Sequence, residues 1–215
     1  MMALTPGGAS SSGESGGSGG EAGPESGSGQ GAGGVAPDNL SFLCAGDYGS
    51  EGINLDAGTR DRAQEQVERF VLTAYGDPGA DASAYERSVE ELVVRECFWD
   101  SPAGGVVNDM EEVARAGGKP NAPSDYTFAR KLVRFEIEYA RRGEDLDTGT
   151  PYTRVVGTAV WVSEEPDGDS RAWQEDLEVG KSPATGGDWE IISGQTIPPQ
   201  VDSEYENFLP DGVET

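Results

Sequence analysis

The spacing of apolar positions changes along the chain from a helical period to a strand period. A first helix is predicted after Thr59, which can cap it, and before the turn that starts at Gly76, because apolar residues recur there every three or four positions. The pair Ser83 and Glu86 has the spacing of a capping box and predicts a second helix. A short third helix is predicted over 108–116.

Beyond Tyr126 the apolar positions alternate with polar ones, as they do in half-buried strands. Four such segments follow one another, separated by turns rich in glycine, proline and aspartate. They cover 133–139, 152–163, 173–179 and a segment that opens at Trp189. The pattern predicts an α+β domain in which two or three N-terminal helices pack on one face of a curled four-stranded antiparallel sheet.

Composition divides the chain further. Residues 1–36 are mostly glycine and serine with almost no large apolar side chain, which is typical of a disordered tether. Residues 37–58 mix apolar and turn residues and are expected to form an ordered arm, and 59–197 hold the α+β domain. The acidic tail 198–215 either frays or docks on the domain or on a partner. The tether itself is either a spacer or an extension without a role.

Charge and residue types limit the function. The chain carries 40 acidic and 15 basic residues and no histidine, for a net charge of −25. Nucleic acid is not an expected partner, since its phosphates would be repelled and the basic residues of 130–142 are interleaved with acidic ones. Without histidine and with two cysteines, histidine-dependent triads and thiolate metal clusters cannot be built. No cofactor and no metal site are predicted.

The N-terminus suggests a location. Residues 1–5 lack the basic and apolar regions of a signal peptide, but 3–10 are similar to the end of a secretory signal with its small-residue cleavage region. We expect the protein to be extracytoplasmic, either secreted or membrane-tethered. Contact with a membrane is expected only through an anchor that precedes Met1.

The order of the predicted elements, a helix hairpin followed by a long meander, ends on Gly187-Asp188-Trp189-Glu190-Ile191-Ile192. With this ending, 59–197 resembles the nuclear transport factor 2-like (cystatin-like) superfamily. It looks most like the extracytoplasmic domains of conjugation-channel scaffold proteins and related lipoproteins. The resemblance implies a non-enzymatic interaction domain with a protein partner in the cell envelope, and self-association is kept as an alternative.

The same superfamily contains small-ligand enzymes such as ketosteroid isomerases and polyketide cyclases, which place carboxylates in an apolar cone. Glu175 is the best candidate for such a carboxylate, because strand parity puts it on the face of Trp173, Leu177 and Val179. The expected hairpins place Val160 and Ser193 beside it. The simpler interpretation is a carboxylate near a sheet edge that is solvated or paired with an arginine. Asp100 is a second candidate base, although Asp-Ser-Pro is also common turn chemistry.

A third functional class is a secreted binding protein for an apolar small molecule. Trp161 and Trp173 are then candidates for stacking on the ligand, and Arg154 for binding its carboxylate. The alternatives are that both tryptophans pack in the core and that Arg154 is an arginine at a strand end whose charge reaches solvent.

Cys44 and Cys97 are the only cysteines. An even count in an oxidising compartment favours a disulfide that would fasten the arm 37–58 to the helix layer, whereas in the cytosol two free thiols are expected.

Overall fold

A computed structural model describes residues 40–44, 50–118, 128–164, 170–197 and 201–214. Contacts divide the chain into Met1–Gly34 and Val35–Thr215, and every described residue belongs to the second unit. The predicted tether 1–36 therefore lies outside the described residues, as do parts of the predicted arm.

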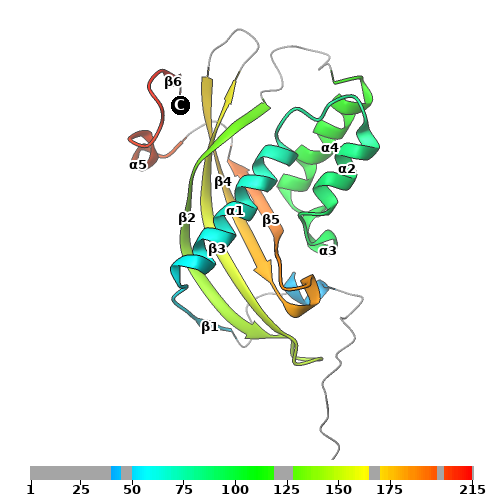
Figure 1. The fold of residues 1–215 in the computed structure, drawn as a ribbon, viewed down its shortest axis with the longest axis vertical. Coiled ribbons are helices and arrows are strands. Elements are labelled where there is room, and N and C mark those ends of the chain that lie inside the picture. The colour runs from blue at the N-terminus through cyan, green and yellow to red at the C-terminus, as the bar shows by residue number, and fades with distance from the viewer. Residues whose placement is uncertain (1–39, 45–49, 119–127, 165–169, 198–200, 215) are drawn as a thin grey trace, which may run out of the picture. The chain divides into compact units, whose positions relative to one another are not determined.

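A six-stranded sheet is the centre of this unit. Its four long strands are antiparallel neighbours in chain order (Figure 1). They are β2 (Phe128–Glu144), β3 (Pro151–Glu164), β4 (Ser170–Lys181) and β5 (Trp189–Ile197). The short β1 (Glu51–Gly52) joins the edge of β2, and β6 (Val213–Glu214) lies parallel to the start of β4.

The predicted α+β class is confirmed, but the predicted count of four strands is too low. β1 and β6 were missed because a strand of two residues is too short to show an alternating pattern.

Four helices cover the concave face of the sheet (Figure 1). They are α1 (Ala57–Ala74), α2 (Ala82–Glu90), α3 (Arg95–Phe98) and α4 (Pro102–Arg115). The three longer helices begin at other residues than predicted. Asp56 caps α1 and Asp81 caps α2, while α4 is capped by Ser101, before Pro102 at its first position. Proline is favoured there, because its missing N–H would have no helical partner.

The main core lies between these helices and the inner face of the sheet. Phe70 and Phe98 from the helices meet Leu177 and Ile191 from the strands, and all four are fully buried. Burial of this kind of apolar surface is the main source of stability. No helix among the described parts of the chain combines the length and apolar character that crossing a bilayer requires.

The C-terminal segment lies on the outer face of the sheet, turned away from the helices (Figure 1). Val201, together with Tyr205 of the short helix α5 (Ser203–Glu206), packs on Val160. The Gln174 amide donates to the Asp202 carboxylate and accepts from the Asp202 N–H, both at 2.9 Å. Of the two alternatives for the tail, residues 201–214 therefore adopt the docked one.

Candidate functional site

Glu175 lies on the inner face of β4 and has no exposed area. The Tyr75 hydroxyl donates a hydrogen bond to Glu175 Oε1 at 2.8 Å. Tyr75 is the C-cap residue of α1, and its ring stacks on Trp161 with 5.2 Å between the ring centroids. A carboxylate and a tyrosine hydroxyl thus meet inside the hydrophobic core.

The backbone of β5 makes room for this carboxylate. A Cβ atom on Gly194 would lie 2.6 Å from Glu175 Oε1 and 2.7 Å from the Leu177 side chain, closer than real Cβ contacts. Any larger residue at position 194 would force these side chains to move, so Gly194 leaves room for Glu175 where it lies. Buried polar groups are stable only when they are hydrogen-bonded, and Tyr75 provides that bond.

The predicted face of Glu175 is confirmed, since Leu177 and Val179 beside it belong to the main core. The predicted neighbours are wrong. Glu175 pairs with Ala159 and Thr196. The β3–β4 register differs by one residue from the expected hairpin, and on β5 the turn η2 (Pro183–Thr185) and a register shift after Glu178 move the pairing further. The prediction of a solvated carboxylate near a sheet edge is also wrong, since Glu175 lies in the interior beside Tyr75, and its pairing with an arginine stays a prediction.

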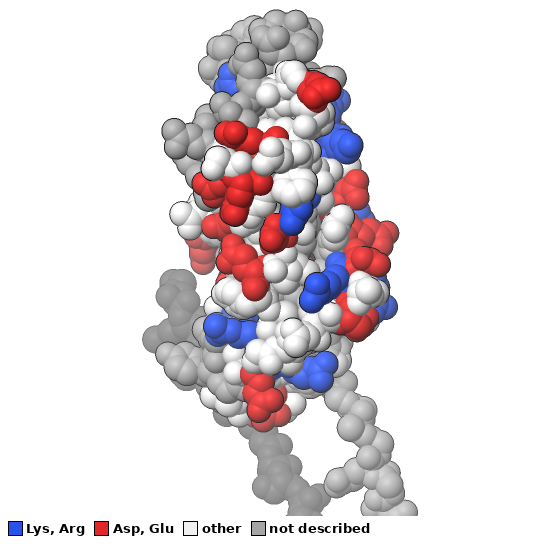
Figure 2. Space-filling model, turned by 90° about the vertical axis from the view of Figure 1, so that its left-hand side faces the viewer, with Lys and Arg blue, Asp and Glu red and all other residues white. Residues whose placement is uncertain are grey.

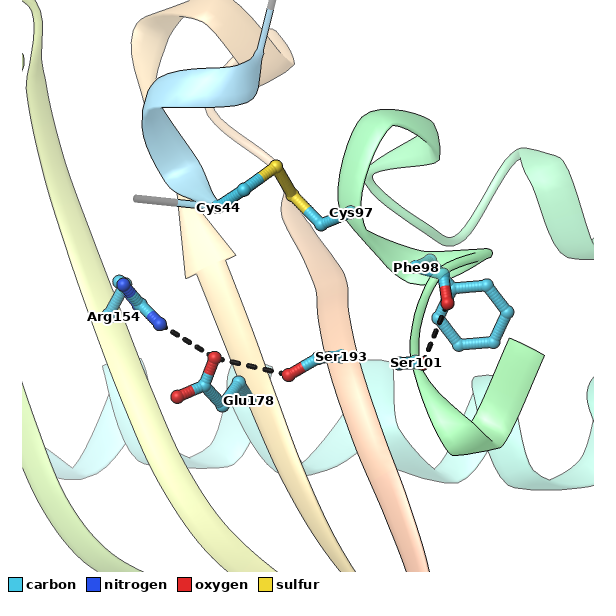
Figure 3. The surroundings of a disulfide bond; sticks show 7 residues. All are labelled: Cys44, Cys97, Phe98, Ser101, Arg154, Glu178 and Ser193. Carbon is cyan, nitrogen blue, oxygen red and sulfur yellow. Dashed lines mark hydrogen bonds and ion pairs between the residues drawn. A yellow bond between two sulfur atoms is a disulfide. The ribbon is translucent and has the colours of Figure 1, made fainter. Parts of the chain in front are cut away.

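Asp100, the second candidate base, is exposed, and no contact described here joins it to Glu175. Its neighbour Ser101 forms the hydrogen bonds that hold this turn. The Ser101 hydroxyl donates to the Phe98 carbonyl at 2.7 Å (Figure 3). It also accepts a hydrogen bond from the Gly104 N–H in the first turn of α4. The turn chemistry of this segment is therefore what the structure shows.

The two candidate ligand-stacking tryptophans face each other across β3 and β4. Trp161 is buried between Tyr75 and the sheet, and the Trp173 indole N–H donates to the Ser163 hydroxyl at 2.8 Å. Both act as packing residues in this conformation.

Arg154, the candidate carboxylate-binding residue, lies on the outer face of β3 and is 7% exposed. It donates to Glu178 Oε2 at 2.6 Å, and the Ser193 hydroxyl donates to the same oxygen at 3.1 Å (Figure 3). The prediction that its charge reaches solvent is therefore wrong. Arg154 does bind a carboxylate, but one that belongs to the chain itself.

Cys44 and Cys97 form a disulfide with 5.4 Å between their Cα atoms, within the range for such a bond (Figure 3). It joins the end of the turn η1 (Ser41–Leu43) to α3, and Leu43 packs on Tyr152 and Ile192 of the sheet. The predicted disulfide is therefore present, and it fastens the arm to both the helix layer and the end of the sheet.

A second group of polar residues occupies the lower end of the sheet in Figure 1, where β3 begins and β4 ends. Arg142, Thr153, Lys181 and Trp189 are direct partners on four neighbouring strands. We call these four residues the basic rung. Strand parity places them on the inner face, because Val155 and Val179 of the same faces belong to the main core.

Three cavities, of about 220, 390 and 500 Å³, open around the basic rung, and Lys181 lines all of them. The sequence pattern alone does not identify this group. Thr153 and Trp189 lie at the starts of predicted strands, whereas Arg142 and Lys181 lie beyond the predicted ends of theirs. Their alignment in one row depends on the register of all four strands.

Glu190 follows the basic rung on β5. Its partial burial, together with the negative charges of Glu96 and Asp188, raises its pKa to about 7. Among the described residues, no cluster of three or more acidic or cysteine side chains has a geometry suited to a metal ion.

Comparison with known proteins identifies no family. The chain matches no protein-family model and no curated protein. Among solved structures, the intermembrane space region of the chloroplast protein ARC6 is 14% identical and aligns over 67% of this chain and 98% of that one. The TM-score of 0.33 does not establish a shared fold. The resemblance to the nuclear transport factor 2-like superfamily stays a prediction.

Proposed function

We propose that this chain is a non-enzymatic interaction domain that works outside the cytoplasm, tethered to the cell envelope. The observation that carries this proposal is the outer side of β2, where Tyr139 and Phe208 are 40% and 50% exposed. The Arg141 guanidinium lies 4.8 Å from the Tyr139 ring and that of Arg134 lies 4.2 Å from the Phe208 ring. Aromatic residues and arginine are the side chains that most often carry the binding energy of protein interfaces.

The charge of this face favours a protein over a nucleic acid. Figure 2 shows acidic side chains spread over it and basic ones scattered among them, with no continuous basic stripe. A phosphate backbone needs such a stripe, whereas a protein partner can complement a mixed surface.

The disulfide supports a location outside the cytoplasm. Cys44 is exposed, and exposed disulfides do not persist where glutathione and thioredoxin keep thiols reduced. Attachment through an anchor that precedes Met1 remains part of the proposal.

The rival class is an enzyme of the isomerase or polyketide-cyclase kind. One observation favours it: the hydrogen bond between Tyr75 and Glu175 joins two group types that can perform acid–base chemistry in an apolar interior. Against an enzyme, Glu175 has no exposed area that a substrate could reach. The third class, a binding protein for an apolar molecule, would also require this interior to open.

Site-specific crosslinking in intact cells tests the interaction. A photoreactive amino acid is placed at Tyr139 or at Phe208, with Leu146, which is also exposed, as the control position. We expect discrete adducts from the first two positions only. An adduct of two copies of this chain would identify the partner as the protein itself, and equal or absent crosslinking at all three positions would overturn the proposal.

Thiol trapping tests the compartment. Free thiols are blocked in intact cells with a membrane-permeant alkylating agent, and the protein is then reduced and labelled with a second agent. We expect both cysteines to take only the second label, because they are paired. If both take the first label, the extracytoplasmic location is wrong.

A further inference from the structure

We propose that the basic rung binds a carboxylate that is carried on an apolar body, such as the last residue of a peptide chain. Arg142, Thr153 and Lys181 together line both the 220 and the 500 Å³ cavities. The proposed position of the carboxylate is beside Thr153, a residue that lines both cavities, between the two cationic side chains.

The spacing of the sheet suits two-sided recognition of an anion. Neighbouring strands lie about 4.8 Å apart, so the Cα atoms of Arg142 and Lys181 are roughly 10 Å apart with Thr153 between them. A guanidinium and an ammonium can approach one carboxylate from opposite sides at this distance, and the Thr153 hydroxyl can donate to it from below. Hydrogen bonds between oppositely charged groups are the strong ones.

Neither cation has a partner in the described parts of the chain. Arg142 and Lys181 form no ion pair with any residue there, although the protein has 40 acidic residues for 15 basic ones. Glu51 of β1 is the direct strand partner of Arg142, but no ion pair joins these two described residues. Both cations of the rung therefore keep the capacity to bind the carboxylate of a ligand.

A buried donor at the rung is also unsatisfied. Trp189 is 5% exposed and lines the 220 and 390 Å³ cavities, and its indole N–H finds no acceptor among the described residues. A buried donor without an acceptor costs free energy. A ligand oxygen in the 220 Å³ cavity could accept a hydrogen bond from this indole N–H after a small shift of the ring.

The acidic residues nearby restrict where the anion can bind. Asp56 is the one acidic residue that lines the 220 Å³ cavity, and hydrogen bonds from Thr59 hold its pKa below its usual range. Four carboxylates and three cations line the 390 Å³ cavity, so it suits an anion less well than the other two cavities.

The walls of the 500 Å³ cavity indicate the rest of the ligand. No acidic residue lines it, and Pro151, Tyr152 and Pro183 contribute to its walls. An apolar side chain next to the carboxylate fits such walls, whereas a strongly acidic peptide would be repelled by the net charge of the protein. Both the C-terminus of a peptide and a small free acid have the required chemistry.

Nuclear magnetic resonance titration of the full chain tests the site. The probes are an acetylated Gly-Ser-Gly-Leu peptide with a free carboxylate, the same peptide with an amidated C-terminus, and 4-methylpentanoate as the small acid. The signal of the Trp189 indole N–H, assigned with a Trp189→Phe variant, reports occupancy. We expect the free-carboxylate peptide to shift this signal and the amidated peptide to leave it unchanged.

Variants separate specific contacts from general attraction. Lys181→Gln and Arg142→Gln should each weaken binding by about tenfold, the usual effect of losing a charge-assisted hydrogen bond. Lys131→Gln is the matched control, because it removes one cation from an exposed position of β2 outside the rung. Its binding should stay within about twofold of the wild type.

The outcomes decide the proposal. If 4-methylpentanoate binds as tightly as the peptide, the site stands and its ligand is a small acid. Binding of the amidated peptide, equal weakening by Lys131→Gln, or no response to either acid would overturn it. The rung lies on the face opposite Tyr139 and Phe208, so its failure would leave the proposed function standing.

Discussion

Glu175 and Lys181 lie on the same face of β4 and yet have opposite surroundings. The carboxylate is sealed beneath α1 and bonded to Tyr75, while the ammonium lies at the end of β4, where it lines three cavities and has no partner among the described residues. The difference comes from the position of each residue along the strand, in the closed core or beside the cavities at the strand end. A charged side chain in the closed core must be satisfied by the fold itself, whereas one that lines a cavity remains available to a ligand.

The largest expected effect concerns the disulfide, which holds the lower end of the sheet rather than the interior. Replacing both Cys44 and Cys97 by alanine should lower the free energy of unfolding by about 4 kcal/mol, because the bond closes a loop across 53 positions of the unfolded chain. Urea denaturation measures this loss, and amide exchange should accelerate around Tyr152 before it does around Glu175.

Reduction of the wild-type protein is the matched control, since it breaks the bond without changing the sequence. It should reproduce the loss, and the double variant should not respond to reductant. A loss below about 1 kcal/mol would show that the arm contributes little and that the lower end is held by the sheet alone.

The second effect tests whether the interior is sealed. Glu175→Leu removes the acceptor of the Tyr75 hydroxyl, and an unsatisfied buried donor costs about 1 to 3 kcal/mol of unfolding free energy. Glu175→Gln keeps a carbonyl oxygen for this bond and should leave the stability equal or higher, since it removes a buried charge.

A double-mutant cycle with Tyr75→Phe provides the control. Because the pair Tyr75→Phe and Glu175→Leu removes both partners, it should be less costly than the sum of the single changes. Additive effects would mean that the hydrogen bond contributes nothing. Loss of a measured turnover in Glu175→Gln, with the fold intact, would favour the enzyme instead.

These two sites also show what the sequence can predict. Parity with Leu177 and Val179 was enough to place Glu175 on the inner face, because alternation is a local property of one strand. Its partner Tyr75 lies 100 positions earlier, at a helix end, and no local pattern connects the two. The neighbours of Glu175 on β5 were misplaced because the connection after Lys181 and the register shift at Glu178 move the pairing.

The sequence does not reveal the basic rung for the same physical reason, because its four residues come from four different strands. Arg142, Thr153, Lys181 and Trp189 are each unremarkable in their own segment, and they form a row only when three registers are known. The disulfide was predictable because two cysteines allow only one intramolecular pairing.

The smallest effect concerns Glu190, a half-buried carboxylate between these extremes. Burial and the charges of Glu96 and Asp188 raise its pKa from 4.5 to about 7, so from about pH 4.5 to 7 the folded protein binds more protons than the unfolded chain. The contribution of this group to stability is therefore fully present at low pH and is lost as the pH rises toward 7. Screening of a partly exposed group limits the effect to less than about 1 kcal/mol.

Glu190→Gln should match the wild type near about pH 4 and be more stable near about pH 8, as measured by urea denaturation. Glu112→Gln removes an exposed charge from α4 and should not show this dependence. If both variants follow the same pH profile, the effect belongs to the net charge of the protein and not to the burial of Glu190.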